Sequence, residues 1–409
     1  MRLPAALALL LWGAPALAQG LSGYAEAKGV AFSERASEGD PWVAGWATLL
    51  LKEEQRLDPA SLAASLRVEA LSSDEDAARF DPADRDPRRS LLSVRELWGR
   101  FALAQALDLQ LGRFELGWGK TDGYSPADAF LPRDLTDPFA DEKLPLWAAR
   151  LSGQRGPVRF EAVAVPVTTP WRLPDLGSRN APVPVSSAAG RIEYEDQEDA
   201  PPVPGFGALR LLAVVGDWDL GAWGRFGVRP APLLTFRADL SQPGSSGVTV
   251  PVERRYAREE GVGLELSRVV GPWVVRAEAA GLFSRDPDLG NALIGTLGAE
   301  RGFGDGTLLV TLAGNVVDPP GDAALLFDRA LLPALIAAWN RAEAWGSWKV
   351  VWTAALAHRD GLVKAEAGYD LADAWKLTLG GELPYGSERG PLGALHAARR
   401  VHLALRYSW

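Results

Sequence analysis

The amino-acid sequence predicts an all-β fold, a single antiparallel transmembrane β-barrel of about 18 strands, with about 16 as the alternative. Three observations support this prediction. Segments of roughly ten residues alternate between apolar and polar side chains, aromatic residues stand near their ends, and the connections alternate between short and long. In such a barrel we expect the short turns on the periplasmic side and the long loops on the extracellular side.

The composition excludes several other classes of protein. The chain has 409 residues and no Cys, which excludes disulfide scaffolds and thiolate metal sites. It carries 43 Lys and Arg against 52 Asp and Glu, a net charge of −9, which disfavours a nucleic-acid-binding protein. No apolar run of about 18 residues follows the N-terminal stretch, so transmembrane helices are not expected.

The N-terminal stretch has the pattern of a secretion signal. Met1 and Arg2 give a basic start, residues 3–17 are mostly apolar, and Ala16-Leu17-Ala18 fits a cleavage site of the A-x-A type. The sequence therefore predicts a signal peptide over residues 1–18, Sec-type export, and a mature chain over residues 19–409. Together with the absence of Cys, this pattern indicates a Gram-negative envelope.

Alternation continues along the chain, over residues 158–162, 219–226, 273–279, 348–356, 363–369, 375–379 and 400–409. In a soluble sandwich or solenoid the apolar face would be a core. In a transmembrane barrel it would contact lipid, and the polar face would line a wet lumen. Aromatic residues at the segment ends favour the barrel, because membrane interfaces are rich in them. The predicted interface aromatics are Trp273, Trp348, Trp375, Tyr407 and Trp409.

Connection lengths fix the strand count. Long outer loops are predicted over residues 72–90, 120–143, 167–205, 229–261 and 317–329. Residues 330–343 have high helix propensity, yet we assign them to a strand, because otherwise a long loop falls on the wrong side. Residues 191–195 also alternate. We place them inside a long loop, because counting them as a wall strand would make the number of wall strands odd.

The polar faces of these segments predict a charged lumen. The predicted pore-lining residues are Arg113, Glu115, Arg159, Glu161, Arg225, Arg276, Glu278, Lys349, Lys364, Glu366, Lys376, Arg400 and Arg406. Nine of them are cationic and four are anionic, so the lumen is expected to favour anions although the chain is acidic. For each residue the alternative is that its charge only keeps the interior wet.

Three features carry a resemblance to a known family. Residues 109–120 read LQLGRFELGWGK, and a D-G and a P-x-D element follow by residue 128. Residues 145–151 read PLWAARL, and the chain ends in Tyr407-x-Trp409. These features resemble porin-like bacterial outer-membrane β-barrel proteins of a poorly characterised branch of the porin superfamily. The resemblance implies a barrel and passive permeation, and it names no solute.

The resemblance also bears on partners. A terminal aromatic on the last strand resembles the signal that the barrel assembly machinery reads, so this machinery and outer-membrane lipids are expected partners. Small solutes are expected in the lumen, and a homotrimer is one assembly that we consider. We do not expect a nucleic-acid partner.

Residues 119–144 form a long connection of mixed charge. We expect it to fold into the lumen as a constriction; standing over the mouth, or being a solvated surface loop, are the alternatives. No cofactor is expected. Divalent cations are considered at two acidic groups of the outer loops, Asp74, Glu75, Asp76, Asp81, Asp84 and Asp86, and Glu193, Glu195, Asp196, Glu198 and Asp199. His396 and His402 are expected on one strand face, too far apart to share a metal.

The sequence therefore predicts an outer-membrane channel for passive diffusion of small polar or anionic solutes. The alternative is a structural or adhesive envelope barrel with a blocked lumen and partner-binding acidic loops. An outer-membrane barrel enzyme is disfavoured: the sequence has no G-x-S-x-G element, and no catalytic residue is predicted.

Overall fold

The computed structural model describes residues 20–35, 40–72, 80–81, 83–86, 89–128, 130–140, 142–183, 186–187, 190–198, 203, 205–236, 247–317, 324–325 and 331–409. The expected signal peptide over residues 1–18, the acidic residues Asp74, Glu75 and Asp76, and Asp199 lie outside these ranges. Within them, no helix combines the length and the apolar character that crossing a bilayer requires.

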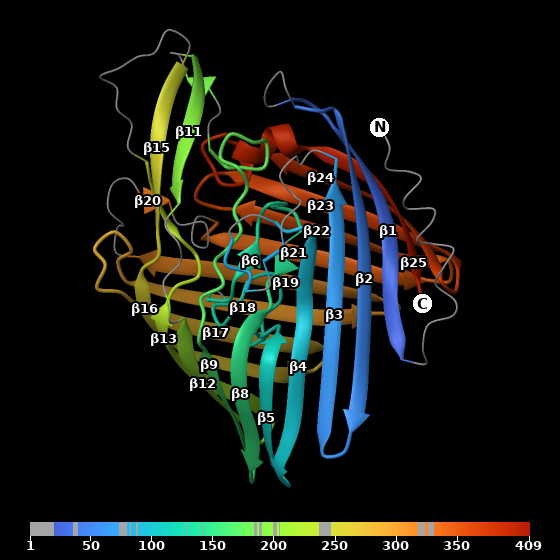
Figure 1. Cartoon of the computed structure of the whole chain (residues 1–409), viewed down its shortest axis with the longest axis vertical. Coiled ribbons are helices and arrows are strands. Elements are labelled where there is room, and N and C mark those ends of the chain that lie inside the picture. The colour runs from blue at the N-terminus through green and yellow to red at the C-terminus, as the bar shows by residue number, and fades with distance from the viewer. Residues whose placement is uncertain are drawn as a thin grey trace.

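Eighteen strands in the described part of the chain form one antiparallel sheet that closes on itself (Figure 1). Each wall strand pairs with the next one along the chain, and β25 pairs with β1 to close the ring, with Tyr24 opposite Ser408. The first nine wall strands are β1 (Leu21–Phe32), β2 (Val43–Leu57), β3 (Ala60–Leu71), β4 (Leu92–Ala104), β5 (Leu107–Phe114), β8 (Leu146–Arg155), β9 (Val158–Val165), β12 (Phe206–Val215) and β13 (Trp218–Val228). The other nine are β16 (Arg258–Val270), β17 (Trp273–Phe283), β18 (Ala292–Phe303), β19 (Gly306–Val317), β21 (Ala334–Glu343), β22 (Gly346–Ala355), β23 (Asp360–Ala372), β24 (Trp375–Tyr385) and β25 (Arg400–Ser408). The predicted 18-stranded barrel is confirmed.

Side chains of the wall strands alternate between the two faces of the sheet. In β16, Glu259 and Glu265 are buried, whereas Val262 and Leu264 between them are 57% and 66% exposed. The outer face is therefore apolar and the inner face carries ionic groups. A barrel in lipid has this arrangement, whereas a soluble sandwich would bury its apolar side chains between two sheets.

One rim of the barrel, here called the short-turn rim, holds the chain's tightest connections. Within the described residues eight turns of two residues lie there, at 58–59, 105–106, 156–157, 216–217, 271–272, 304–305, 344–345 and 373–374. Four of them begin with Gly156, Gly216, Gly271 or Gly304 at φ between 58° and 61°. This left-handed conformation favours glycine and suits two-residue hairpin turns.

The opposite rim, here called the loop rim, holds the other nine connections between wall strands of the described barrel. They cover residues 33–42, 72–91, 115–145, 166–205, 229–257, 284–291, 318–333, 356–359 and 386–399. Short and long connections thus alternate as predicted. Residues 334–343 form wall strand β21, as expected despite their helix propensity, because pairing with β19 and β22 outweighs local preference.

A second sheet of five strands stands at the loop rim (Figure 1). Its strands are β10 (Ser186–Ser187), β11 (Gly190–Glu198), β15 (Gly247–Arg255), β14 (Leu233–Phe236) and β20 (Ala324–Leu325). Residues 191–195 lie in β11, which pairs in parallel with β15 and not with a wall strand. Their placement outside the wall is confirmed.

Two further elements occupy the long connections. A two-stranded sheet of β6 (Arg133–Asp134) and β7 (Glu142–Lys143) lies between β5 and β8. The 3-10 helix η2 (Gly393–Ala398) lies between β24 and β25 and contains His396. The prediction that His396 shares a strand face with His402 is wrong, because residues 393–398 form helical turns before β25 begins.

Candidate permeation pathway

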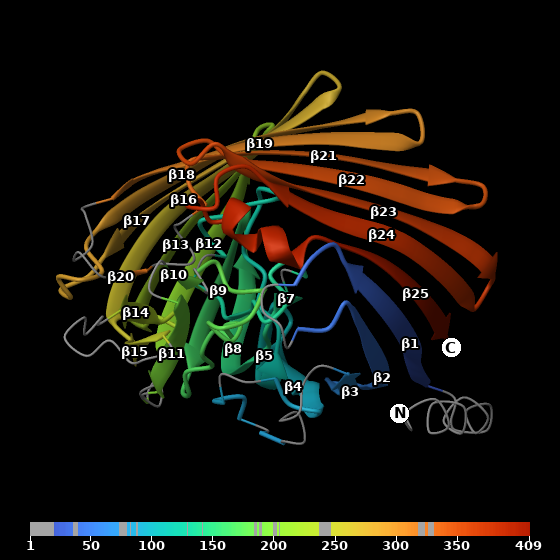
Figure 2. The ribbon, with the colours of Figure 1, turned by 90° about the horizontal axis from the view of Figure 1, so that it is seen from above.

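The connection of residues 115–145 between β5 and β8 turns into the barrel and is here called the inner loop. Figure 2, seen from above, shows its strand β7 inside the ring of wall strands. Glycine permits the turn inward. Gly112 has a φ of 126°, and a Cβ there would lie 2.1 Å from the carbonyl oxygen of Leu97. The Asp128 carboxylate then accepts the backbone N–H groups of Trp118 at 2.8 Å and Gly119 at 3.0 Å, which closes the turn.

An aromatic cluster attaches the inner loop to one wall of the barrel. Phe130 packs at 5.6 Å between ring centroids against Trp118 of the same loop. It also packs at 5.5 Å against Phe206 of β12 and at 5.7 Å against Trp223 of β13. All four side chains are buried. Apolar burial therefore holds the loop against the inner face of β12 and β13.

Glu278, on the inner face of β17, binds the first turn of the inner loop. Its carboxylate accepts the backbone N–H of Lys120 at 2.7 Å and the hydroxyls of Thr121 at 2.8 Å and Ser125 at 2.6 Å. The backbone N–H of Thr121 also donates to it, at 2.5 Å. This predicted pore-lining residue is buried, and its charge is stabilised by hydrogen bonds from the loop.

Trp118 is held by two further wall residues. Its indole Nε1 donates to the carboxylate of Glu161 on β9 at 2.9 Å, and its carbonyl oxygen accepts a hydrogen bond from Arg210 on β12. Arg210 in turn pairs with Glu265 of β16 at 2.6 Å. A chain of charged groups on the wall therefore fixes this part of the loop.

The far end of the inner loop binds the opposite part of the wall. Arg400 of β25 donates from Nη2 to both carboxylate oxygens of Asp137, at 2.9 and 2.8 Å, and from Nε to Glu382 of β24 at 2.9 Å. Lys364 of β23 donates to the carbonyl oxygen of Phe139 at 2.5 Å. The inner loop thus spans the lumen from β12, β13 and β17 to β23 and β25.

Buried ion pairs join the inner loop to two other connections at the loop rim. Asp84 pairs with both Arg113 and Arg172, and Asp134 pairs with Arg172 at 3.2 Å and with Arg89 at 3.1 Å. Burial alone would raise the pKa of Asp134, but the guanidiniums of Arg89 and Arg172 hold this pKa well below its usual range. Arg113, a predicted pore-lining residue, is therefore paired with Asp84, and its Nε donates to the carbonyl oxygen of Val94 at 2.6 Å.

Charged side chains on the inner face of β22 to β25 and β1 form three rows across the strand register. The row nearest the loop rim is Lys364, Glu382 and Arg400. The middle row is Lys349, Glu366, Gly380 and His402. The row nearest the short-turn rim is Asp370, Lys376, Arg406 and Glu26, with Lys376 at 3.8 Å from Asp370 and Arg406 at 2.7 Å from Glu26. Predicted lining residues thus lie in all three rows, four of them in the first two and two in the third.

The other predicted lining residues lie elsewhere. Arg225 pairs with Glu259, is buried, and lies over Phe130 at 5.1 Å. Arg276 pairs with Glu300 at 2.7 Å and reaches Asp122 of the inner loop at 3.5 Å. Arg159 and Glu115 are exposed. None of these four residues belongs to the three rows.

The sequence reasoning missed a basic group on β4, β5 and β8. Arg100, Gln110 and Arg150 are neighbours in the register, and both guanidiniums donate to the Gln110 amide oxygen, that of Arg100 at 3.4 Å. The Nε of Arg150 has no hydrogen-bond partner among the described residues. The alternation of Glu96, Trp98 and Arg100 along β4 was the signal that could have identified this face.

The predicted interface aromatics lie near the short-turn rim. Trp273 packs against Phe303 at 6.5 Å, and Tyr407 packs against Trp375 at 4.9 Å and Trp409 at 5.8 Å. Trp348 follows the turn at 344–345 and lies opposite Arg341. These side chains, here called the aromatic belt, lie at one end of the barrel wall.

Asp81 and Asp84, two acidic residues of the 72–91 connection, are bound by donors of the protein. The Asp81 carboxylate accepts backbone N–H groups from Ala83 at 3.0 Å, Arg85 at 2.6 Å and Asp86 at 2.8 Å. Burial would raise the pKa of Asp81, but these N–H groups lower it. Since Asp84 binds two arginines, these two carboxylates contact protein donors and are not grouped around a cation.

Solved structures of a bacterial porin align with this chain over nearly its whole length. Two engineered variants of the porin of Rhodopseudomonas blastica align over 95% of this chain and 99% of theirs. Their sequence identities are 10% and 11%, and their TM-scores are 0.40 and 0.41. No family model matches the chain, and no curated protein matches it. The similarity concerns the fold alone, and the closed barrel itself establishes that fold.

Proposed function

We propose that the chain is an outer-membrane, porin-like channel through which small polar or anionic solutes diffuse passively. The observation that supports this most is the inner loop, which lies inside the ring of wall strands and binds two facing parts of the wall. Ionic rows on the inner face of β22 to β25 lie beside it. A confined aqueous path lined by fixed charges selects solutes by size and by field.

The preference for anions is supported by cationic side chains on the inner face that form no ion pair among the described residues. Arg100 and Arg150 share one neutral amide, and Lys349 lies beside Glu366 in the register without a contact to the inner loop among the described residues. By contrast, the carboxylate of Glu265 is paired with Arg210, and that of Glu278 accepts hydrogen bonds from the inner loop. Fixed positive charge that is not compensated attracts anions.

Conductance of the purified full chain in planar bilayers tests the proposal. We expect ohmic single-channel steps, and a reversal potential in a KCl gradient that shows anion preference. A reversal potential that shows cation preference would refute the anion preference, but it would still support a channel. Folded protein that inserts and gives no steps would refute the channel itself.

The same proposal includes location and assembly. Residues 1–18 direct export and are removed. The barrel assembly machinery reads the last strand, β25, and the Trp409 that follows it. The aromatic belt at the short-turn rim lies at the lipid interface. A homotrimer is proposed as the assembled form. The N-terminal sequence of the mature protein, its recovery in outer-membrane fractions, and the mass of the detergent-solubilised particle test these three points.

A structural barrel with a closed lumen is the second candidate. It is favoured by the buried ion pairs that lock three connections together at the loop rim, through Asp84, Asp134 and Arg172. In that case the loop rim would bind a partner and the lumen would carry no current. The bilayer experiment separates the two candidates.

A further inference from the structure

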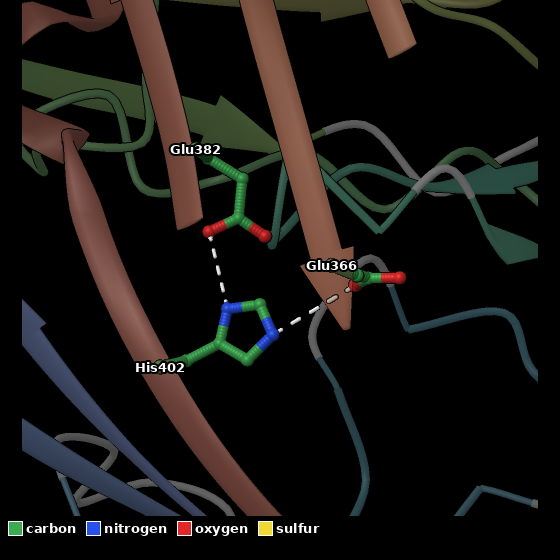
Figure 3. Close-up of side chains that lie close together, drawn as sticks. All are labelled: Glu366, Glu382 and His402. Atoms are coloured by element: carbon green, nitrogen blue, oxygen red, sulfur yellow. Dashed lines mark ion pairs between the residues drawn. The ribbon is translucent and has the colours of Figure 1, made fainter. Parts of the chain in front are cut away.

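His402 lies between two carboxylates on three adjacent wall strands. Figure 3 shows its imidazole on β25 facing Glu382 of β24 and Glu366 of β23. The Nδ1 atom lies 3.4 Å from Glu382 and the Nε2 atom lies 3.7 Å from Glu366. His402 and Glu382 are buried, whereas the Glu366 side chain is 48% exposed. The group therefore opens toward solvent on the Glu366 side only.

The imidazole rests on a glycine. A Cβ at Gly380 would lie 2.5 Å from both Cε1 and Nε2 of His402, and 3.0 Å from Cγ of Glu366. The space above Gly380 is therefore shaped by the absence of a side chain and is occupied by the ring and by Glu366. The buried Nδ1 makes no hydrogen bond within the described residues, although it faces the Glu382 carboxylate. A buried polar atom without such a bond is costly, and a small shift of the ring toward Glu382 would let Nδ1–H donate to that carboxylate.

We propose that this group is a binding site for a late first-row divalent cation such as Zn²⁺. One ligand atom from each of Glu366, Glu382 and His402 lies within 4.8 Å of the others. An imidazole nitrogen and a carboxylate oxygen as direct ligands, with a second carboxylate orienting the imidazole, suit Zn²⁺, whereas a hard cation such as Mg²⁺ prefers an all-oxygen set with several waters.

Roles within the group follow from its geometry. His402 Nε2 and the accessible Glu366 carboxylate face the lumen and are the direct ligands, with water completing the coordination from that side. Glu382 is held by Arg400 at 2.9 Å and faces Nδ1, so it is the positioning residue that accepts Nδ1–H and directs Nε2 outward. A small contraction of the 3.7 Å gap between Nε2 and Glu366 would bring both atoms around one ion.

The fixed charges around the group limit its affinity. Lys349 is opposite Glu366 and Lys364 is opposite Glu382 in the register, and Arg400 also binds Asp137. These cations stabilise the carboxylates before an ion binds, and they oppose added positive charge. We therefore expect reversible binding, not a structural metal on which folding depends.

Titration of the full chain in detergent with ZnCl₂, followed by calorimetry, tests the proposal and is independent of whether the lumen conducts. We expect one ion per chain, and no competition from a large excess of MgCl₂. His402→Gln and Glu366→Gln should each weaken Zn²⁺ binding at least tenfold, and Glu382→Gln should weaken it about 10–100-fold as an orienting partner. The exposed His358, in the 356–359 connection, supplies the control His358→Gln, which should bind Zn²⁺ as the unaltered chain does.

Gly380→Ala keeps every proposed ligand and still tests the site. The added methyl group occupies the space of the ring, so Zn²⁺ binding should fall by a similar factor while circular dichroism shows an intact β-barrel. Absence of Zn²⁺ binding by the folded unaltered chain would overturn the proposal. So would binding that survives both His402→Gln and Gly380→Ala, or binding of Mg²⁺ at the same strength.

Discussion

Arg400 on the last wall strand binds both carboxylate oxygens of Asp137, a residue that precedes it by 263 positions in the chain. Nη2 lies 2.9 and 2.8 Å from the two oxygens, and the Arg400 side chain is almost fully buried. This pair joins the inner loop to the strand that closes the barrel. Together with the bond from Lys364 to Phe139, it makes the loop a bridge across the lumen and not a flap attached to one wall.

Asp137→Asn should loosen the far end of the inner loop. Replacing the carboxylate by an amide weakens a hydrogen-bonded charge pair, which is worth about 1.5–3 kcal/mol. We expect larger and noisier single-channel currents and faster proteolysis within residues 130–140. Asp217→Asn is the matched control, because Asp217 lies in the 216–217 turn, forms an exposed pair with Arg268 at 3.3 Å, and should leave both measurements unchanged. Equal behaviour of the two variants would contradict the bridging role.

Gly263→Ala should destabilise the barrel. A Cβ at Gly263 would lie 2.3 Å from the ring of Trp223, which packs in the aromatic cluster beneath the inner loop. Overpacking of this kind costs about 1–3 kcal/mol in the free energy of unfolding. Urea unfolding of the protein in detergent measures this free energy. Gly314→Ala on β19 is the control, since a Cβ there would meet nothing within 4 Å; a similar loss in that variant would show that β-strand propensity, and not Trp223, sets the cost.

The loop-rim ion pairs should resist moderate acid. Asp134 has a pKa below its usual value in the folded chain, so its contribution to stability is fully present above the ordinary Asp pKa of about 3.9. That contribution begins to fall as pH drops through about 3.9 and is lost only below the depressed folded pKa. Protease protection of residues 166–183 should therefore persist at about pH 5 and decline only in stronger acid.

Asp134→Asn provides the comparison at neutral pH. The amide leaves Arg89 and Arg172 without one of their carboxylates, so this variant should lose protection of residues 166–183 where the unaltered chain keeps it. Protection that is lost near pH 6 in the unaltered chain would indicate that another group controls the rim.

Lys349→Glu should shift ion selectivity toward cations. Lys349 lies on the inner face of β22, and no contact joins it to the inner loop in the described chain, so the substitution changes the field without releasing the loop. A screened charge near the path changes the relative permeability of anions and cations by about two- to tenfold. The reversal potential in a KCl gradient measures it. Arg389→Glu in the exposed 386–399 connection makes the same charge change away from the wall strands, and an equal shift there would remove Lys349 from the path.

The barrel could be predicted from local patterns. Alternation, turn glycines such as Gly216 and Gly271, and the parity of loops were enough to place β21 in the wall against its helix propensity and β11 outside it. Alternation and turn glycines are properties of a few consecutive residues, and the parity of the loops depends only on their order along the chain. The strand pairing then follows from the order of the chain.

The partners of the lumen residues could not be predicted in the same way. Alternation states which face Glu278 occupies, but not that it binds Thr121, 157 residues away. Alternation placed Arg113 on the lumen, and the structure pairs it with Asp84, which lies 29 positions earlier in the chain and outside any local pattern. The carboxylates near His402 could not be predicted from the sequence around it, because Glu366 and Glu382 lie on other strands.

The bridge between Asp137 and Arg400 also orders events during biogenesis. Asp137 emerges in the first third of the polypeptide, whereas its arginine arrives with the final hairpin. Until that strand docks, Asp137 lacks its arginine, and the far end of the segment depends on earlier strands, for example on the bond from Lys364 to Phe139. The bridge is therefore completed last, when β25 pairs with β1 and the seam is sealed.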